Sequence, residues 1–538
     1  MSEFLYRTED IPADEILRYF VETRRDREIV NSLKARNPIV LAGSRGVGKS
    51  FLLRVAESEL ITEVASDRVF PVYVTFSKSS LINTTDQLQF QHWMLAKICA
   101  RLVRALSKSG LLVAAPASLS ILTGQENGPP LTAETPMEKI AAAFENSWKQ
   151  APGSIDLAGL PAIEAFKDAI EDLCENLKIA RFIIFVDEAA HIFLPEQQRQ
   201  FFTLFRDLRS PYISCKAAVY PGVTSYGDSF QPMHDATMIA FERDILSPDY
   251  ISNMREIVEK QSESEMISDI ARHGQNFAIL AYAASGNPRV LFKTLNRVPR
   301  VTAQLTNEVI REYYRSDIWS EHSMLPEKYS GHRALIDWGR KFIENEILPD
   351  LKRKNDAYLQ GEPKASTCFF WIHRDAPQPI KEALKLLAYT GIVGEHAIGI
   401  KATRGEIGTR YAVNLGCLFS LEATPTTTAL PIAQSLTPRR MGEYGANHTA
   451  YQSLLSEMPT FCEPSVTDIL QKQLSKPIDV LDIAYWQRQG LRALNLTTVG
   501  DVLNASEYKL MEISYVGEKR SRRMRNAAMG AVYEYLSG

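Results

Sequence analysis

The residues with the clearest chemical purpose form one glycine-rich segment near the start of the chain, Gly43-Ser44-Arg45-Gly46-Val47-Gly48-Lys49-Ser50. Its pattern is G-x-x-x-x-G-K-S, in which the glycines let the backbone wrap so that its N–H groups point at phosphate oxygens. In such a loop Lys49 reaches the β- and γ-phosphates and the hydroxyl of Ser50 binds Mg²⁺. The segment, together with Phe51, therefore predicts a binding site for a nucleoside triphosphate.

A phosphate loop needs a strand before it and a helix after it, and both are predicted. Residues 38–42 form a short apolar run, and residues 51–56 continue as a helix whose N-terminus favours anions. The alternative is a glycine-rich turn that binds no ligand. The strand and helix on either side favour the phosphate loop.

Two acids after a buried strand supply the second half of the expected nucleotide site. Residues 183–186 are apolar and are followed by Asp187 and Glu188. At the end of such a strand Asp187 would hold Mg²⁺, and Glu188 would polarise the water that attacks the γ-phosphate. The alternative is a strand end whose aspartate caps the next helix. No N-K-x-D sequence that would read guanine is present, so ATP is preferred over GTP.

A third segment, residues 285–292, adds a basic residue to the site. Gly286 and Pro288 predict a turn and the start of a helix, so Arg289 falls in its first turn. An arginine in that place can reach the γ-phosphate and respond to whether ATP or ADP is bound. The alternative is an ordinary surface arginine at a helix start.

The composition is that of a soluble multidomain protein. Its 538 residues are 45% hydrophobic and 23% charged, and the net charge of -3 excludes a wholly basic protein but not a local basic patch. No apolar run is long enough to cross a bilayer, and the N-terminal residues do not resemble a signal peptide. Six scattered cysteines without a C-x-x-C pair favour reduced thiols and a cytoplasmic location.

Strand and helix patterns alternate through the first part of the chain. Apolar runs at 70–76, 182–186 and 215–220 predict further strands, and the intervening periodicity predicts helices, which together indicate an α/β fold with a parallel sheet. We expect this core over 1–245, with an insertion near 80–175, and residues 110–135 are expected to be a loop or part of that insertion. Residues 246–320 are predicted to be helical throughout.

The next region is predicted to be a helix followed by a β-hairpin. Residues 380–387 are an amphipathic helix, and the following residues form two short strands with a Gly/Arg-containing turn. This order resembles a winged helix, expected over 321–422, which places a helix in a DNA groove. Packing only against protein is the alternative. Residues 423–480 are expected to be linker and helices, with the Thr/Pro-rich stretch 423–440 read as the linker.

The last segment, residues 481–538, resembles a helix-hairpin-helix domain, notably the C-terminal domain of the RNA polymerase α subunit. Gly517 opens its second helix, and residues 509–525 contain six basic and two acidic residues. This pattern predicts contacts to a nucleic-acid backbone. A module that docks onto protein is the alternative. The expected nucleic-acid residues are Gly517, Lys519, Arg520, Arg522 and Arg523.

The order of these motifs resembles the AAA+ superfamily, specifically the origin-recognition-type and signal-transducing (STAND) ATPases. The resemblance covers roughly residues 20–315 and implies that Arg289 is the sensor-2 arginine of a helical lid. It also implies that residues 25–28 shape the adenine pocket. One departure concerns the sensor-1 strand, which usually ends in a polar residue, whereas 215–220 is followed by no asparagine. This departure puts efficient hydrolysis in doubt.

Two functions follow from this pattern. The first is an ATP- and Mg²⁺-dependent switch that hydrolyses ATP and engages DNA, in genome maintenance or antiviral defence. The second is a STAND-like sensor that oligomerises with ATP and activates a protein partner, with the tail as an interaction module. Both imply a homo-oligomer that is not bound to a membrane. A nucleotide-binding scaffold with little turnover is a third option.

Overall fold

The structure is a computed structural model of the chain. It describes residues 4–76, 82, 84, 86–111, 118–124, 134–147, 153–187, 195–221, 224–328, 333–457, 474–481 and 483–536. Two compact units are present, Met1–Thr306 and Asn307–Gly538.

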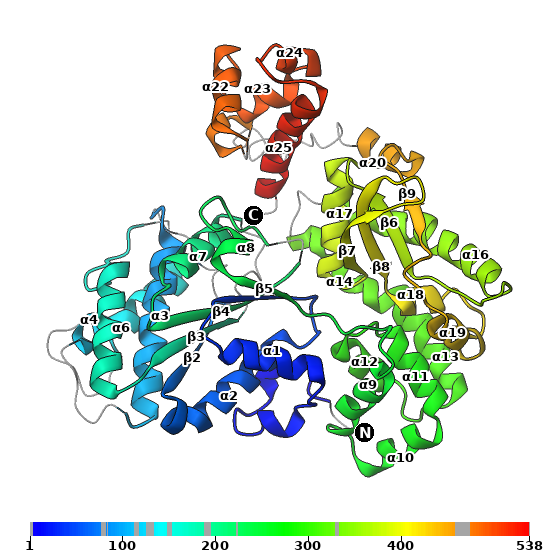
Figure 1. Cartoon of the computed structure of the whole chain (residues 1–538), viewed down its shortest axis with the longest axis horizontal. Helices are drawn as coiled ribbons and strands as arrows, with labels where there is room; N and C mark the ends of the chain where they lie inside the picture. Colours follow the sequence, from blue (N-terminus) through cyan, green and yellow to red (C-terminus); the bar gives the residue numbers. More distant parts are fainter. Residues whose placement is uncertain are drawn as a thin grey trace. The chain divides into compact units, whose positions relative to one another are not determined.

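The first unit contains a five-stranded parallel sheet in the order β2-β3-β4-β1-β5 (Figure 1). This is the parallel α/β fold expected from the sequence. The edge strand β5 was not predicted, because it is short and only partly buried. The strands are β1 (Ile39–Ala42), β2 (Val69–Thr75), β3 (Arg181–Asp187), β4 (Ile213–Val219) and β5 (Thr237–Ala240).

Hydrophobic cores cover both faces of this sheet, which is why its central strands are mostly apolar, with the buried Lys216 of β4 as an exception. Along β3, Phe182 and Ile184 join one core, and the alternating residues Ile183 and Phe185 join the other. The first core is completed by α3 (Gln89–Lys108), α4 (Leu119–Thr123), α5 (Pro136–Asn146), α6 (Ile163–Leu177) and α7 (Pro195–Asp207), and the second by α1 (Arg24–Lys34) and α2 (Lys49–Asp67).

The region expected as an insertion near 80–175 supplies α3 to α6, which belong to the main core of the unit. Within it, the prediction of a loop over 110–135 was wrong at α4, whose Leu119 and Leu122 are buried. Apolar residues at helical spacing outweigh the loop-like composition there. Residues 112–117 and 125–133 lie outside the described part.

A group of short helices follows β5 within the first unit. The prediction that this stretch is helical is confirmed. After the one-turn helix α8 (Pro232–Asp235) and β5, the helices are α9 (Tyr250–Glu259), α10 (Ser264–Arg272), α11 (Gly274–Ala283) and α12 (Pro288–Leu295). Helix α12 begins with Pro288, and the side chain of Asn287 caps it by accepting from the N–H of Val290.

The second unit opens with long helices and contains a four-stranded sheet in the order β7-β8-β6-β9. Helix α17 (Gln378–Tyr389) is followed by the antiparallel hairpin of β7 (Val393–Lys401) and β8 (Ile407–Val413), as the sequence predicted. The preceding helices are α13 (Ala303–Glu312), which begins in the first unit, α14 (Ile318–Lys328), α15 (Arg333–Phe342) and α16 (Leu348–Tyr358).

Residues 423–440 are not a linker, contrary to the sequence prediction. They contain helix α19 (Pro425–Gln434), and they lead into β9 (Gly442–Tyr444), which pairs with β6 (Phe369–His373) in the sheet. Proline and threonine suggested an extended linker, but Pro425 occupies the first helical turn, where its missing N–H is tolerated. The helices α18 (Leu415–Phe419) and α20 (Gln452–Glu457) lie on either side of this stretch along the chain.

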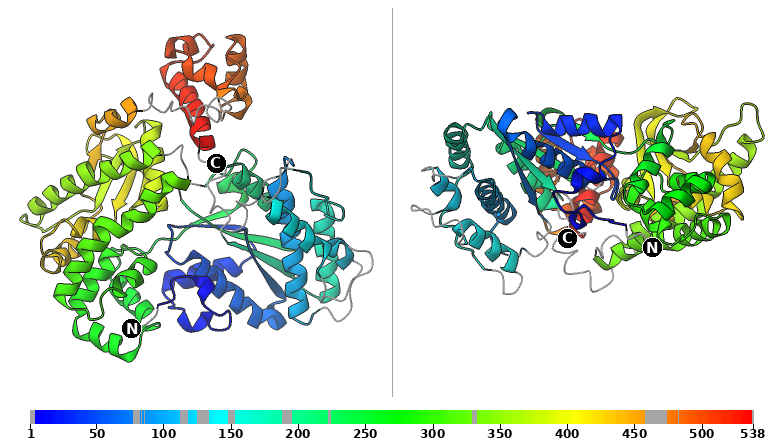
Figure 2. Two further views of the ribbon diagram at one scale, coloured as in Figure 1. Left: turned by 180° about the vertical axis from the view of Figure 1, so that it is seen from behind. Right: turned by 90° about the horizontal axis from the view of Figure 1, so that it is seen from below.

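The described chain ends in a four-helix module with its own hydrophobic core. The hairpin that joins its last two helices includes Tyr515 and Gly517. The helices are α22 (Tyr485–Ala493), α23 (Val499–Asn504), α24 (Glu507–Met511) and α25 (Glu518–Leu536), drawn in orange and red in Figures 1 and 2.

Among the described helices, none combines the length and apolar character that a bilayer-spanning helix needs. The five cysteines within the described residues are buried and form no disulfide, and Cys462 lies outside that part.

Candidate nucleotide-binding site

The glycine-rich segment forms a tight loop between β1 and α2. Its residues Gly46 and Gly48 have φ angles of 90° and 109°, in the left-handed region that strains any residue with a side chain. A Cβ atom added at Gly46 would lie 2.6 Å from Oδ1 of Asn287. The loop therefore needs its glycines both for its backbone path and for the close approach of the residue that caps α12.

Lys49, the first residue of α2, is almost fully buried. Its ammonium group donates hydrogen bonds to the carbonyl oxygens of Gly43 at 2.7 Å and Ser44 at 2.9 Å. It also lies 4.1 Å from the centroid of the Tyr220 ring, just beyond the end of β4. Burial lowers the pKa of Lys49 to about 7. A phosphate group would stabilise the charged form that burial disfavours.

Ser50 and Asp187 lie side by side at the carboxyl edge of the parallel sheet. Ser50 lies in α2, which comes after β1, and Asp187 is the last residue of β3. The hydroxyl of Ser50 donates to Oδ1 of Asp187 at 3.0 Å, and the hydroxyl of Tyr73 donates to Oδ2 at 2.6 Å. Two oxygen donors at one point are the ligands that Mg²⁺ prefers when phosphates and water complete its shell. Glu188, the expected general base, lies outside the described residues.

Tyr73 was not identified from the sequence, although it contacts the expected metal-binding aspartate. It lies in β2, which pairs with β3 so that Thr75 is opposite Asp187. Burial and the nearby carboxylate raise the pKa of Tyr73 well above its usual value, so its hydroxyl remains a donor. The guanidinium of Arg54 lies 3.4 Å from the centroid of its ring and fixes its orientation.

Glu242 was also missed. One of its carboxylate oxygens accepts from the N–H of Ser44 at 2.7 Å, and the other accepts from the Ser44 hydroxyl at 3.2 Å. Because Glu242 follows β5, its carboxylate attaches the start of the phosphate loop to the segment after that strand.

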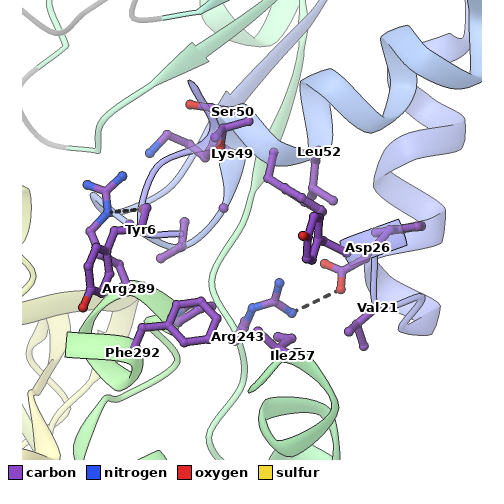
Figure 3. A pocket seen from close by; sticks show the side chains of 18 of the residues that line it. Tyr6, Val21, Asp26, Lys49, Ser50, Leu52, Arg243, Ile257, Arg289 and Phe292 are labelled. Carbon is purple, nitrogen blue, oxygen red and sulfur yellow. Dashed lines mark hydrogen bonds and ion pairs between the residues drawn. The ribbon is translucent and has the colours of Figure 1, made fainter. Parts of the chain in front are cut away.

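A partly buried ion pair joins Arg243, the residue after Glu242, to α1. Arg243 donates to Oδ2 of Asp26 at 3.1 Å, and the same oxygen accepts from the hydroxyl of Thr23 at 2.8 Å. Asp26 belongs to the stretch 25–28, which the resemblance assigned to the adenine pocket. The ion pair, drawn as a dashed line in Figure 3, attaches this stretch to the chain that leads into the short helices.

The short helices contact the phosphate loop through two neighbouring residues. Asn287 donates from Nδ2 to the carbonyl oxygen of Arg45 at 2.7 Å. Arg289 donates from Nε to the carbonyl oxygen of Tyr6 at 3.1 Å, and its charge lies close enough to lower the pKa of Lys49 (Figure 3). The structure therefore brings Arg289 to the loop, whereas the contribution of Asn287 and Tyr6 was not predicted.

One pocket is lined by the phosphate loop together with Tyr6, Asp26, Tyr220 and Arg289. One part of the wall is cationic and includes Arg45, Lys49, Arg243 and Arg289. Another part is apolar, where a base would be shielded from water, and is formed by Phe20, Val21, Ile257 and Phe292. The expected loop residues Gly46, Val47, Gly48, Ser50 and Phe51 line the same pocket.

The residues of the pocket fit a nucleoside triphosphate. The loop can exist only with its glycines, a buried lysine lies at the start of α2, and a helix N-terminus opens beside it. Ser50 and Asp187 also fit a magnesium ion that shares its shell with phosphates. Within the described residues no cluster of three or more His, Cys, Asp or Glu forms a self-sufficient metal site.

The residues expected to contact nucleic acid lie together in the C-terminal module, but one of them is already paired with a carboxylate. Gly517 immediately precedes α25, whose first turns contain Lys519, Arg520, Arg522 and Arg523, all exposed. Arg522 forms an ion pair of 3.5 Å with Glu507, which the charge pattern did not reveal. Its guanidinium is thus partly neutralised by the module itself.

Comparison with known proteins connects the first part of the chain to one family. The model of the ORC-CDC6-like family matches residues 4–110, which contain the phosphate loop and helices α1 to α3. No match was found among curated proteins. Among solved structures, the Aeropyrum pernix ORC1 protein in complex with DNA is 14% identical, with 78% of this chain and 95% of that chain covered and a TM-score of 0.28. A TM-score this low does not establish a shared arrangement.

Proposed function

We propose that the protein is an AAA+-type ATPase of the ORC-CDC6-like kind that binds ATP with Mg²⁺, hydrolyses it and engages DNA as a nucleotide-dependent switch. The single observation that carries the proposal is the pocket lined by the glycine loop, Ser50 and Arg289, in which Ser50 is hydrogen-bonded to Asp187. The family match over the phosphate loop supports it.

Each described residue has a task in this proposal. Lys49 and the N–H groups at the start of α2 hold the phosphates, and Arg289 adds charge at the outer phosphate. Ser50 and Asp187 hold Mg²⁺, which when bound neutralises charge that develops on the phosphate oxygens. Glu188 orients and deprotonates the attacking water. Tyr220 follows β4, near the usual place of a sensor-1 polar residue, so we expect slow turnover.

The contact of Asn287 with the loop gives a physical basis for a switch. A change at the phosphates shifts the loop backbone, and the hydrogen bond from Asn287 to Arg45 carries that shift directly to α12. The short helices then have two states that a nucleotide can bias, provided it binds one of them better.

Steady-state ATP hydrolysis tests the proposal. The full chain should hydrolyse ATP slowly, and Glu188→Gln should retain ATP binding while turnover falls by roughly 10²–10⁴-fold. Duplex DNA should stimulate the rate, and Arg520→Glu combined with Arg523→Glu should weaken that stimulation. Unchanged turnover in Glu188→Gln would contradict the assigned base, and a rate insensitive to DNA would contradict the coupling.

A further inference from the structure

The C-terminal module, residues 474–536, displays aromatic rings in an unusual way. Among side chains that the structure describes, four aromatic ones are strongly exposed, and all four belong to this module. Tyr515 is 87% exposed, Tyr508 81%, Tyr485 67% and Trp486 42%. Four solvent-exposed aromatic rings on one small module indicate a binding surface.

Tyr515 stands at the tip of the hairpin between α24 and α25, in a conformation that a tyrosine rarely adopts. Its φ is 66°, in the left-handed region, where the resembled hairpin has glycine. Such strain persists only where the surrounding structure enforces it, and it clusters at functional sites. The ring makes no contribution to the core of the module, since it is almost fully exposed.

Trp486 borders the same guanidinium as Tyr515. Arg520 donates to the carbonyl oxygen of Tyr515 at 2.5 Å, and its Cζ lies 5.7 Å from the centroid of the Trp486 ring. Helix α22 packs closely on the hairpin, because a Cβ at Gly490 would lie 2.3 Å from Cγ2 of Ile513. Arg520 therefore has both the Trp486 ring and the backbone of Tyr515 as neighbours, and we call the exposed residues Trp486, Tyr515, Lys519, Arg520 and Arg523 the aromatic-basic patch.

The charges around this patch are available to a ligand. Lys519, Arg520 and Arg523 are exposed and form no ion pair with a described residue. By contrast, the other basic side chains of this region are paired: Lys509 with Glu512, and Arg522 and Arg525 with Glu507. Cations without a carboxylate partner, next to exposed rings, match a polyanion that also carries flat bases.

We propose that the aromatic-basic patch binds DNA with unpaired bases, so that Tyr515 and Trp486 stack on bases while Lys519, Arg520 and Arg523 contact the phosphates. The inference rests on the proposed engagement of DNA and specifies the form of DNA. Stacking is tolerant of sequence because every base has a π-face. In a duplex the faces of the bases are stacked on one another, so the rings gain less there.

Fluorescence anisotropy with the full chain tests this proposal. The probes are a single strand, the matching duplex, and a strand of the same length and charge in which abasic sites replace most nucleotides. We expect the single strand to bind more tightly than the abasic strand by roughly fivefold to a hundredfold for each stacked base. Equal binding of the single and abasic strands would overturn the proposal.

Tyr515→Gly is the decisive variant. Glycine adopts the native φ more readily than tyrosine, so this change removes the ring while keeping or raising the unfolding temperature. Binding of the single strand should weaken toward that of the abasic strand, and Tyr515→Trp should restore it. Tyr508→Ala is the matched control, an exposed tyrosine of the same module, and should leave binding unchanged. An equal loss in both tyrosine variants would contradict the assignment of the patch.

The outcomes separate this inference from the proposed function. Equal affinity for single strand and duplex, with no effect of Tyr515→Gly, would overturn the stacking proposal and leave DNA engagement intact. Failure to bind any probe would overturn both proposals. Lys519→Gln with Arg523→Gln should weaken all three probes alike, because those residues contact phosphate.

Discussion

Lys49 is the residue whose protonation most directly links the site to its ligand. Its ammonium group lies among two loop carbonyls and the Tyr220 ring, with Glu242, Asp187, Arg289 and Arg45 as the nearby charges. Burial disfavours its charged form, whereas a bound triphosphate would favour it. Binding of ATP should therefore take up a proton above neutral pH.

We predict that the Kd for ATP rises as pH increases from 7 to 9. In the protein without ATP the pKa of Lys49 is about 7, and in the complex with ATP it is higher. At pH values between these two pKa values, the Kd rises by up to about tenfold per pH unit. Titration calorimetry in buffers of different ionisation enthalpy measures both the Kd and the proton uptake. Lys49→Arg should show a flat profile, because arginine stays charged. A flat wild-type profile without proton uptake would contradict this account.

Tyr73→Phe should weaken the apparent affinity for Mg²⁺. The change removes the hydroxyl that donates to Asp187 at 2.6 Å and keeps the ring beneath Arg54. Loss of such a supporting hydrogen bond typically costs about 10–100-fold in metal affinity. The measurement is the Mg²⁺ concentration that gives half-maximal ATP binding.

Tyr250→Phe is the control for that experiment. Its hydroxyl is equally buried but bonds to the carbonyl oxygen of Ala281 and the N–H of Gly286, among the short helices. This variant should lose stability without a change in Mg²⁺ dependence. Equal shifts in both variants would show that Tyr73 acts only through the fold.

At the scale of elements, the start of α12 links the short helices to the phosphate loop. Asn287 caps α12 and donates to the carbonyl oxygen of Arg45. Asn287→Ala should lower the free energy of unfolding by about 1 kcal/mol and weaken ATP binding by about two- to tenfold. Chemical denaturation and ATP titration measure the two effects.

The matched control is Asn276→Ala. Asn276 makes a similar hydrogen bond, from Nδ2 to the carbonyl oxygen of Val301 at 2.8 Å, without contact to the loop. It should lose comparable stability with unchanged ATP affinity. If both variants lost ATP affinity equally, the contact at Arg45 would have no special role.

Local residue types were enough to predict the phosphate loop and four strands of the sheet. Glycine at positive φ, a lysine at a helix start and unbroken apolar runs are signals carried by neighbouring residues. The contacts of Tyr73, Glu242 and Asn287 were not predictable, because each joins segments far apart in the chain. The prediction of a linker at 423–440 was wrong for another reason. In composition, a proline at a helix start cannot be told from a proline in a linker.

At the scale of the whole molecule, the proposed switch combines two binding functions, one assigned to each unit. The nucleotide pocket is formed entirely by residues of the first unit, and the aromatic-basic patch lies in the second. Either function can therefore be removed by substitution without touching the other. Because the net charge is -3, the proposed binding of DNA would depend on a local group of cations.

Lys519→Gln with Arg523→Gln should reduce the salt dependence of DNA binding by the full chain. Each lost phosphate contact lowers the slope of log K against log salt by about 0.7 on a single strand. Anisotropy titrations over a series of salt concentrations measure that slope. Arg522→Gln should change it less, because Glu507 already pairs with Arg522. A larger effect at Arg522 would contradict the assignment of Lys519 and Arg523 as phosphate contacts.

The central claim is that the loop at residues 43–50 binds ATP with Mg²⁺, and calorimetric titration of ATP into the full chain tests it most directly. The account predicts one nucleotide per chain, weaker binding when Mg²⁺ is chelated, and loss of binding in Lys49→Ala. Binding of equal affinity in Lys49→Ala, or no binding by the wild-type chain, would contradict it.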